Sequence, residues 1–133
     1  MTAIKVADAT KSIPLITAVL VLPFFDMRRL AGEIALADNL TDGRLVLGFG
    51  SGYQQYEFHK FGVDLKNSKQ IFHETLELVE QFMSGSDAIE YDGEFIKAPE
   101  THFIVRPLQK RMDMYIAGQV HDQPMQKHIA EMG

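Results

Sequence analysis

Three glycines on alternate positions form the stretch of this sequence with the clearest chemical use. Gly48, Gly50 and Gly52 stand in the run GFGSGY, directly after a short apolar segment. Glycines at a strand end remove Cβ atoms from one side of the backbone, so a flat or anionic ligand can approach the peptide N–H groups. The hydroxyl of Ser51 adds a hydrogen-bonding group there. A tight, close-packed turn without a ligand fits the same pattern, and this stretch alone leaves both interpretations open.

Other catalytic patterns are incomplete. The glycine run differs from the dinucleotide-binding pattern G-x-G-x-x-G because its third glycine comes one position early. Ser51 lacks the strand–turn–helix context and the later acid and histidine partners of a hydrolase nucleophile. The five histidines are scattered without the i, i+4 spacing of a helical zinc site, and the chain has no cysteine. The sequence therefore predicts neither a metal site nor an identifiable catalytic residue.

The composition is that of an ordinary globular domain. The 133 residues are 46% hydrophobic and 23% charged, and 13 Lys and Arg against 18 Asp and Glu give a formal charge of −5. This acidic balance without a basic cluster argues against nucleic acid or an anionic membrane surface as the main partner. The apolar run 15–25 is far shorter than the roughly 20 residues that span a bilayer. A cytoplasmic location fits these features.

The elements that must position the glycine run begin with a predicted strand. Residues 1–12 are mixed and polar and are expected to be an N-terminal extension or loop. The near-continuous apolar run 13–22 is rich in β-branched residues and predicts a strand buried on both faces, as in a parallel sheet. A core helix is the competing interpretation, and Pro14 and Pro23 at the ends of the run favour the strand.

A helix and a second strand follow directly. Asp26 is a plausible N-cap, and apolar residues recur at helical spacing from Leu30 to Leu40. Asp42-Gly43 provides the stop, and the apolar segment 44–47 then leads into the glycines. A strand, a helix and a strand with tight connections form the βαβ unit, whose strands are parallel.

The second half of the chain predicts two more strands, two helices and a hairpin. Residues 53–65 carry many aromatics with little periodicity and are expected to pack as an ordered loop. The segment 68–83 has the strongest helical periodicity in the chain. The remaining predictions are a hairpin over 88–96 turning at Asp92-Gly93, a short strand at 103–105, a buried strand at 112–117 and a helix at 124–132. The fold class is therefore α/β, with parallel strands, helices and a β-hairpin insertion.

Six ordered motifs resemble one known family. They are TAVLVLP at 17–23, LTDGRLVLGFGSGYQQYEF at 40–58, FGVDL at 61–65, YDGEF at 91–95, RPLQK at 106–110 and YIAG at 115–118. Together they are similar to the bacterial luciferase-like monooxygenase family, over nearly all residues from about position 13 onward. The resemblance implies residues 13–133 to be a partial (β/α)8 TIM barrel, covering roughly barrel strands three to five, behind the extension 1–12.

The resemblance also implies a function. Members of the family are oxidoreductases that use reduced FMN or, in some branches, the deazaflavin F420, and act on small organic substrates. A whole barrel takes roughly 250 residues, so we expect this chain to complete its fold by self-association, as a homo-oligomer. The alternative is a catalytically silent half-barrel fragment or paralogue with a structural, oligomer-forming role, which binds no cofactor.

The cofactor-binding residues that the resemblance implies lie at three strand ends. Ala18 and Val19 match a pair that often holds a non-proline cis peptide beneath the flavin ring. The second group, at the end of barrel strand four, is Gly48, Gly50, Ser51 and Gly52. The third group, at the end of strand five, where the family commonly holds the cofactor phosphate, is Ala117, Gly118 and Gln119. Many members carry Arg where this chain has Ser51, whose hydroxyl can bond phosphate but brings no charge.

Overall fold

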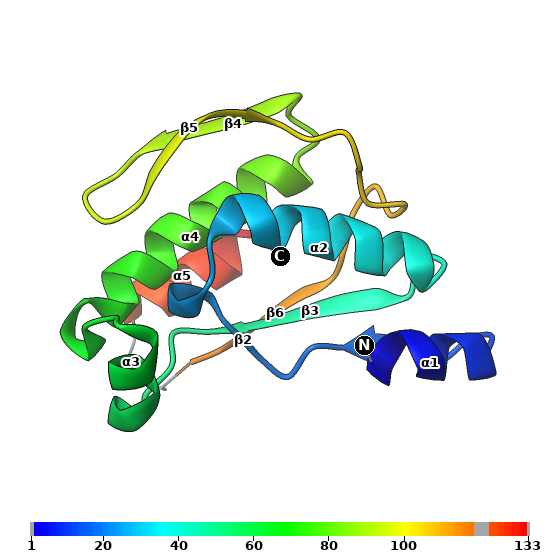
Figure 1. The fold of residues 1–133 in the computed structure, drawn as a ribbon, viewed down its shortest axis with the longest axis horizontal. Helices are drawn as coiled ribbons and strands as arrows, with labels where there is room; N and C mark the ends of the chain where they lie inside the picture. Colours follow the sequence, from blue (N-terminus) through cyan, green and yellow to red (C-terminus); the bar gives the residue numbers. More distant parts are fainter. Residues whose placement is uncertain (1, 119–122, 133) are drawn as a thin grey trace.

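The protein is built in three layers: a parallel sheet, a pair of helices and a hairpin (Figure 1). The structure, a computed structural model, describes residues 2–118 and 123–132. Helices α2 (Met27–Leu40) and α4 (Ser68–Met83) cover one face of the sheet, and the hairpin of β4 (Ala88–Asp92) and β5 (Lys97–His102) lies over the helices. The α/β class with parallel strands is thereby confirmed.

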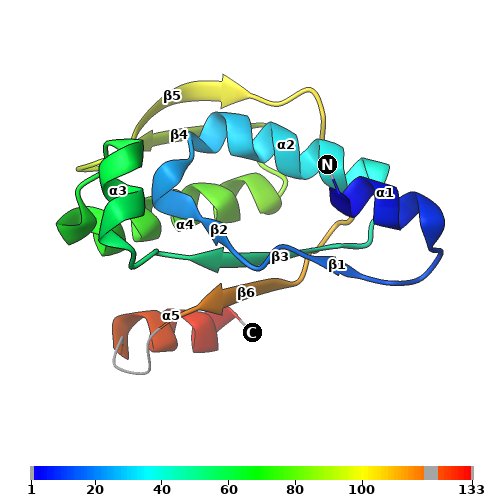
Figure 2. The same cartoon turned by 60° about the horizontal axis from the view of Figure 1, so that its bottom comes forward.

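Strand β3 (Leu45–Gly50) is the centre of the sheet. Two short strands, β1 (Leu15–Ile16) and β2 (Leu20–Val21), pair with one of its edges, and β6 (Met114–Ala117) pairs with the other, all in parallel (Figure 2). Hydrophobic residues of β3 that face the helices are fully or almost fully buried: Leu45, Leu47 and Phe49. This central strand carries the glycine run out of the core to the carboxyl edge of the sheet.

The predicted strand at 13–22 is broken by one extra residue. Ile16 pairs with Val46 and Leu20 pairs with Phe49, so three residues of the outer strand oppose two of β3, as in a β-bulge. The bulge contains the cis peptide Ala18–Val19, at the pair that the family resemblance indicated. The expectation of burial on both faces is wrong, because Ile16 is 56% exposed.

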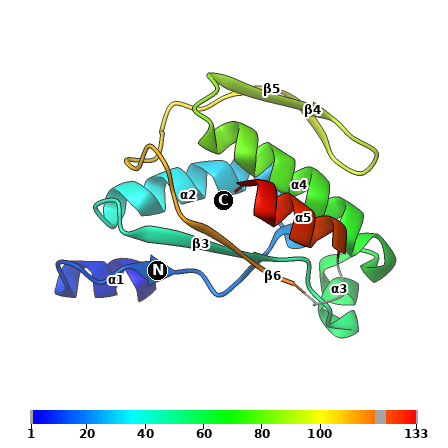
Figure 3. The same ribbon diagram turned by 180° about the vertical axis from the view of Figure 1, so that it is seen from behind.

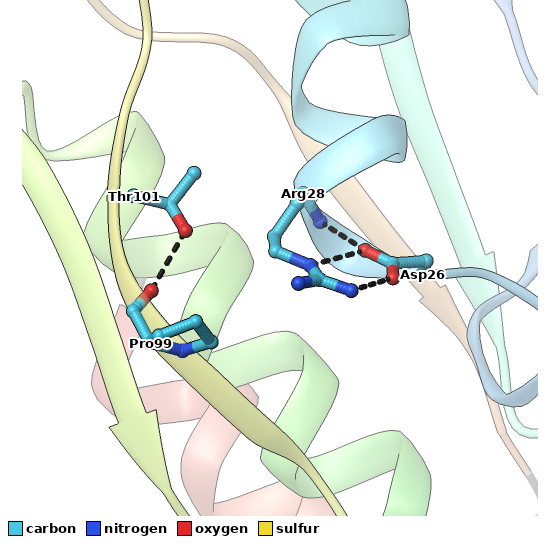
Figure 4. Close-up of polar contacts among 4 residues, drawn as sticks. All are labelled: Asp26, Arg28, Pro99 and Thr101. Carbon is cyan, nitrogen blue, oxygen red and sulfur yellow. Dashed lines mark hydrogen bonds and ion pairs between the residues drawn. The ribbon is translucent and has the colours of Figure 1, made fainter.

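Helices α2 and α4 form where the apolar spacing predicts them. The side chain of Asp26 caps α2 by accepting a hydrogen bond from the Arg28 backbone N–H at 2.9 Å, and its carboxylate also binds the Arg28 guanidinium (Figure 4). The helix ends in left-handed backbone at Asp42 (φ 53°) and Gly43 (φ 69°). The buried stripes of α2 and α4 join β3 in one hydrophobic core.

The chain contains two helices where we expected loops. Helix α1 (Thr2–Ala9) replaces the loop at 1–12, and Arg44 explains its docking: its guanidinium donates to the carbonyls of Ala7 and Thr10 at 2.8 and 3.0 Å. Helix α3 (Gln55–Phe61) replaces the loop at 53–65 and ends at Gly62 with φ 69°. Both helices are short and bury a single residue each, Ala7 and Phe58, so periodicity could not reveal them.

Other predicted elements match in kind and differ in their limits. The hairpin exists, but β5 begins at Lys97, so its connection is longer than the predicted Asp92-Gly93 turn. Residues 103–105 form no strand, contrary to prediction. Two 3-10 turns, η1 (Leu22–Phe24) and η2 (Leu65–Asn67), precede α2 and α4, and α5 (Gln123–Met132) confirms the last helix.

The last helix packs against α4 beside the end of β6 (Figure 3). His128 and Glu80 join the two helices at 2.8 Å, with about a third of each side chain exposed. The helices that the structure describes are all too short or too polar to cross a bilayer.

Candidate functional site

A pocket of about 500 Å³ lies where β2, β3 and β6 end. The strand register places the last residues of these strands, Val21, Gly50 and Ala117, side by side at one edge of the sheet. Helices α3, α4 and α5 supply the other walls. The lining residues are Val19, Val21, Gly50, Ser51, Gly52, Tyr53, Glu57, Ser68, Lys69, Phe72, His73, Ile116, Ala117, Gly118 and Met125. Ligands of α/β proteins characteristically bind at this carboxyl edge of the strands.

Six of the nine predicted cofactor residues line this pocket. They are Val19, Gly50, Ser51, Gly52, Ala117 and Gly118. Ala18 and Gly48 are not among the lining residues, because they lie at the bulge, before the ends of the strands. Gln119 lies outside the described residues. The three strand ends named by the sequence are thus brought together around one cavity.

The glycines fit closely against the protein's own chain. A Cβ on Gly48 would overlap the backbone oxygen of Thr17, and one on Gly50 would lie 3.0 Å from Val19 Cγ2. Gly52 has φ 76°, and its Cβ would lie 2.7 Å from Phe58 Cε2. Gly118 differs, because a Cβ there would meet open space. Close packing therefore explains the three glycines of the GFGSGY run, whereas Gly118 leaves room in the pocket.

Polar side chains from α3 and α4 line the wall that the sequence left unassigned. Glu57 comes from α3, and Ser68, Lys69 and His73 come from the first turns of α4. Because residues 53–65 were expected to be a loop, Glu57 had no predicted position. Lys69 and His73 stand four residues apart on the most periodic helix, beside its apolar stripe, which is the signal that could have placed them on one face.

The electrostatics of this wall are mixed. Glu57 brings an acidic side chain to this wall, and Lys69 brings a basic one. The Glu57 carboxylate also raises the pKa of the neighbouring Tyr56, whose hydroxyl donates to Glu57 Oε1 at 3.3 Å. Across residues 2–118 and 123–132, no group of three or more His, Cys, Asp or Glu side chains is arranged to hold a metal ion. The pocket therefore combines apolar residues, such as Val19 and Ile116 from the strands, with polar side chains from α3 and α4.

Comparison with known proteins identifies the family. The sequence model described as Luciferase-like monooxygenase matches residues 2–124. The uncharacterized protein y4vJ of Sinorhizobium fredii is 41% identical over 104 residues. The oxygenase component of the flavin-dependent trigonelline monooxygenase of Acinetobacter baylyi is 32% identical over 106 residues. Each alignment covers 78% of this chain and 29% of the relative, so the chain spans less than a third of their length. The chain belongs to the luciferase-like monooxygenase family.

Solved structures agree with this assignment. Monooxygenase RslO1 from Streptomyces bottropensis superposes with a TM-score of 0.84 at 26% identity, over 96% of this chain and 38% of that one. The oxygenating constituent of 3,6-diketocamphane monooxygenase from Pseudomonas putida, solved with FMN, gives 0.79 at 20% identity over 97% and 39%. The F420-dependent tetrahydromethanopterin reductase from Methanopyrus kandleri gives 0.71 at 21% identity over 88% and 38%. The latter two support the fold, a part of a luciferase-like TIM barrel.

Proposed function

We propose that this chain supplies the cofactor-binding strand ends of an oxidoreductase that uses reduced FMN, with F420 as the alternative cofactor, and acts on a small organic substrate. The observation that carries the proposal is the pocket at the ends of β2, β3 and β6 in a chain of this family. Relatives of known cofactor include both a complex with FMN and an F420-dependent enzyme.

The pocket residues fit a flavin. Ala117 and Gly118 have little or no side chain, so a planar ring can lie close to the end of β6. Val19 and Ile116 offer apolar contact to the ring, and the Ser51 hydroxyl can donate to a polar group of the cofactor. When bound, the flavin or deazaflavin supplies the redox chemistry, and these residues bind and orient it. A cavity of about 500 Å³ lies within the range of small-molecule sites.

Self-association is a second part of the proposal. Ile16 and Tyr115 are 56% and 59% exposed. They lie on the sheet face that turns away from α2 and α4, since Ile16 pairs with Val46 and Tyr115 with Gly48. Within the described part of the chain, the outer edge of β6 pairs with no strand. Exposed apolar faces and free strand edges favour association.

A groove beside the free edge supports the same interpretation. It has a volume of about 520 Å³ and is lined by Leu76, Met83, Ile129 and residues 110–116. These observations also favour the second candidate function, a half-barrel that forms oligomers without binding a cofactor. The two candidates differ in what they predict for FMN.

A binding titration with mass measurement separates these candidates. We expect the purified chain to bind FMN or F420 saturably at micromolar concentration and to run above its monomer mass of 15.0 kDa in light scattering. A stable oligomer that binds neither cofactor would contradict the enzymatic proposal and support the silent half-barrel.

Gly118→Val tests whether the pocket is the binding site. The added side chain enters open space, so we expect the free energy of unfolding to stay unchanged. We expect the cofactor to bind at least about tenfold more weakly than to the wild type. Gly62→Ala is not a suitable control, because its φ of 69° adds strain; Gly32→Ala on α2 has open space and ordinary backbone. Equal affinity of Gly118→Val and the wild type would place the cofactor elsewhere. Gly50 is a poorer position, since its Cβ would press on Val19.

A further inference from the structure

Helix α5 forms one wall of the pocket and buries little apolar surface of its own. Among the α5 side chains that the structure describes, Met125 alone is buried, at 4% exposed, and it lines the pocket. Ile129, one turn later on the same face, stays 39% exposed and lines the groove beside β6. A helix of 10 residues is marginal without packing, so the position of this wall depends on the contacts of α5 with its neighbours.

A hydrogen bond joins α5 to α4 behind this wall. The two helices lie side by side (Figure 3), and Nε2 of His128 is 2.8 Å from Glu80 Oε1. The exposed fractions of the two side chains are 33% and 28%, so water competes only in part for these atoms. A carboxylate accepts and does not donate, so the imidazole donates this bond from Nε2. Hydrogen bonds to a carboxylate are stronger than those between neutral groups.

We propose that Glu80 and His128 are positioning residues, whose hydrogen bond keeps α5 closed against the pocket and slows the release of the cofactor. The inference rests on the proposed function, since it assumes that a flavin or deazaflavin occupies the pocket. Neither Glu80 nor His128 is among the residues that line the pocket. They therefore act through Met125, which lies one turn before His128 on α5.

The expected size of the effect follows from the small burial of α5. A wall with one buried methionine gains little from apolar packing, so one hydrogen bond changes the balance between its closed and open positions. Loss of such a bond shifts a two-state balance about two- to tenfold. Because the ligand leaves when the wall opens, we expect the dissociation rate to rise by the same factor.

Single and double variants test the role of the bond in cofactor release. Glu80→Ala and His128→Ala should each raise the dissociation rate constant of FMN about two- to tenfold. The double variant should release FMN no faster than either single variant, since all three lack the same bond. Glu80→Gln keeps an acceptor oxygen and should stay within about twofold of the wild type. Wild-type rates in both alanine variants, or effects that multiply in the double variant, would contradict the inference.

Two features guard this experiment against loss of the fold. Alanine is the residue that most favours helices, so neither alanine variant should unfold α4 or α5. Glu77→Ala is the matched control, because the Glu77 carboxylate also lies on α4 but accepts its hydrogen bond from Tyr91 of the hairpin. Its FMN dissociation rate should equal that of the wild type.

Oxidation of Met125 measures the position of the wall without a cofactor. Hydrogen peroxide converts accessible methionine to its sulfoxide, and mass spectrometry of peptides follows each site. Met27 on α2 is also 4% exposed and provides the reference rate in the same sample. We expect the ratio of the Met125 rate to the Met27 rate to rise about two- to tenfold in Glu80→Ala and to stay at the wild-type value in Glu80→Gln. An unchanged ratio in Glu80→Ala would overturn the inference.

The two measurements separate this inference from the proposed function. If the wild type binds neither FMN nor F420, the proposed function fails, and a raised oxidation ratio would still support the closed wall. If FMN binds and Glu80→Ala raises the oxidation ratio without changing the dissociation rate, the bond holds α5 but does not retain the cofactor, and the inference is wrong. Oxidation of Met27 that rises in parallel with Met125 would show a general loss of stability and would also contradict it.

Discussion

The absence of a side chain at Gly48 allows the segment 16–20 to pack closely on β3. The extra residue in the bulge pushes the carbonyl of Thr17 over Gly48, where a Cβ would overlap it. The Thr17 hydroxyl also accepts from the Gly48 N–H at 2.8 Å. The bulge, the threonine and the glycine are thus one packing unit, and this unit holds the peptide Ala18–Val19 at the foot of the pocket.

Gly48→Ala should therefore destabilise the protein. The new methyl group would displace a backbone carbonyl, so we expect the free energy of unfolding to fall by about 1–3 kcal/mol. Urea denaturation followed by circular dichroism measures this. The control, Gly32→Ala, adds a methyl group in open space inside α2 and should raise the stability by about 0.5–1 kcal/mol. Two variants with the same sign would refute this account of the glycine run.

The sequence indicated which residues lie at the site, but it only partly indicated why those residue types are needed there. The spacing of Gly48, Gly50 and Gly52 marks a strand end without showing whether a ligand or the chain itself fills the space beside them. That question depends on the positions of Thr17, Val19 and Phe58, which are set by the bulge and by α3. The position of His73 in the pocket was also not predictable, because the pocket is lined by α3 together with α4 and the sequence did not predict α3.

At the scale of the element, α2 begins with a capping interaction that depends on pH. Asp26 caps the helix and binds Arg28, and the hydrogen bond from the Arg28 side chain is the main cause that lowers the pKa of Asp26 below 3.8. A lowered pKa in the folded state stabilises the fold above about pH 4 and loses this effect as the carboxylate is protonated at lower pH.

Asp26→Asn should reveal this charge. The amide keeps a capping oxygen but loses the ion pair, whose two side chains are about half exposed, so we expect a loss of roughly 0.3–1 kcal/mol at neutral pH. The difference from the wild type should stay constant above about pH 5 and shrink below the ordinary pKa of Asp. Denaturant titrations of both proteins between pH 3 and pH 7 measure this difference in the free energy of unfolding. A difference that grows on acidification would contradict the assignment.

The hairpin is anchored to α4 by one carboxylate. Glu74 accepts three successive backbone N–H groups of the turn, from Glu94, Phe95 and Ile96, at 2.8, 3.0 and 2.7 Å. Such charge-assisted bonds are stronger than neutral ones. A carboxylate on α4 thus holds the turn where the sequence predicted only an Asp-Gly corner, and this explains why the connection extends to Lys97.

Glu74→Ala should release the turn. We expect a loss of about 1.5–3 kcal/mol and faster amide hydrogen exchange at the three turn residues. Glu77→Ala is the matched control on the next turn of α4. Among the residues that the structure describes, Glu77 accepts a hydrogen bond from the Tyr91 hydroxyl alone, at 2.6 Å. Burial, followed by this hydrogen bond, raises the pKa of Tyr91, so its hydroxyl remains a donor. Equal exchange rates in the turn of both variants would argue against the anchor.

Elements with long apolar stripes were predictable, and those held by distant contacts were not. The spacing in α2 and α4 reflects the core that they cover, whereas α1 depends on Arg44, which is 34 positions away from Thr10. Residues 103–105 had the composition of a strand but form none, and the neighbouring Arg106 instead stacks on the rings of Phe82 and Phe103. Propensity is overruled there by a tertiary contact.

At the scale of the whole molecule, the βαβ pattern makes the strands parallel. The same arrangement leaves one face of the sheet without covering helices. Strands β1 and β2 lie on one side of β3 and β6 on the other, with both helices on one face. Family membership adds that relatives are about three times as long. The sequence could predict this layout because connections in such units are right-handed and short. It could not indicate which residues are exposed on the bare face, the face of the sheet that turns away from α2 and α4.

The bare face gives the last prediction. If self-association covers it, Tyr115→Lys and Ile16→Lys should each reduce the mass measured by light scattering toward 15.0 kDa, since a lysine on a buried apolar interface is costly. Leu36→Lys is the control: Leu36 is 52% exposed, close to the 56% of Ile16, but lies on α2 away from this face. Its mass should equal that of the wild type. If Leu36→Lys dissociates the protein and the two sheet variants do not, the interface lies on the helices and the sheet face remains uncovered.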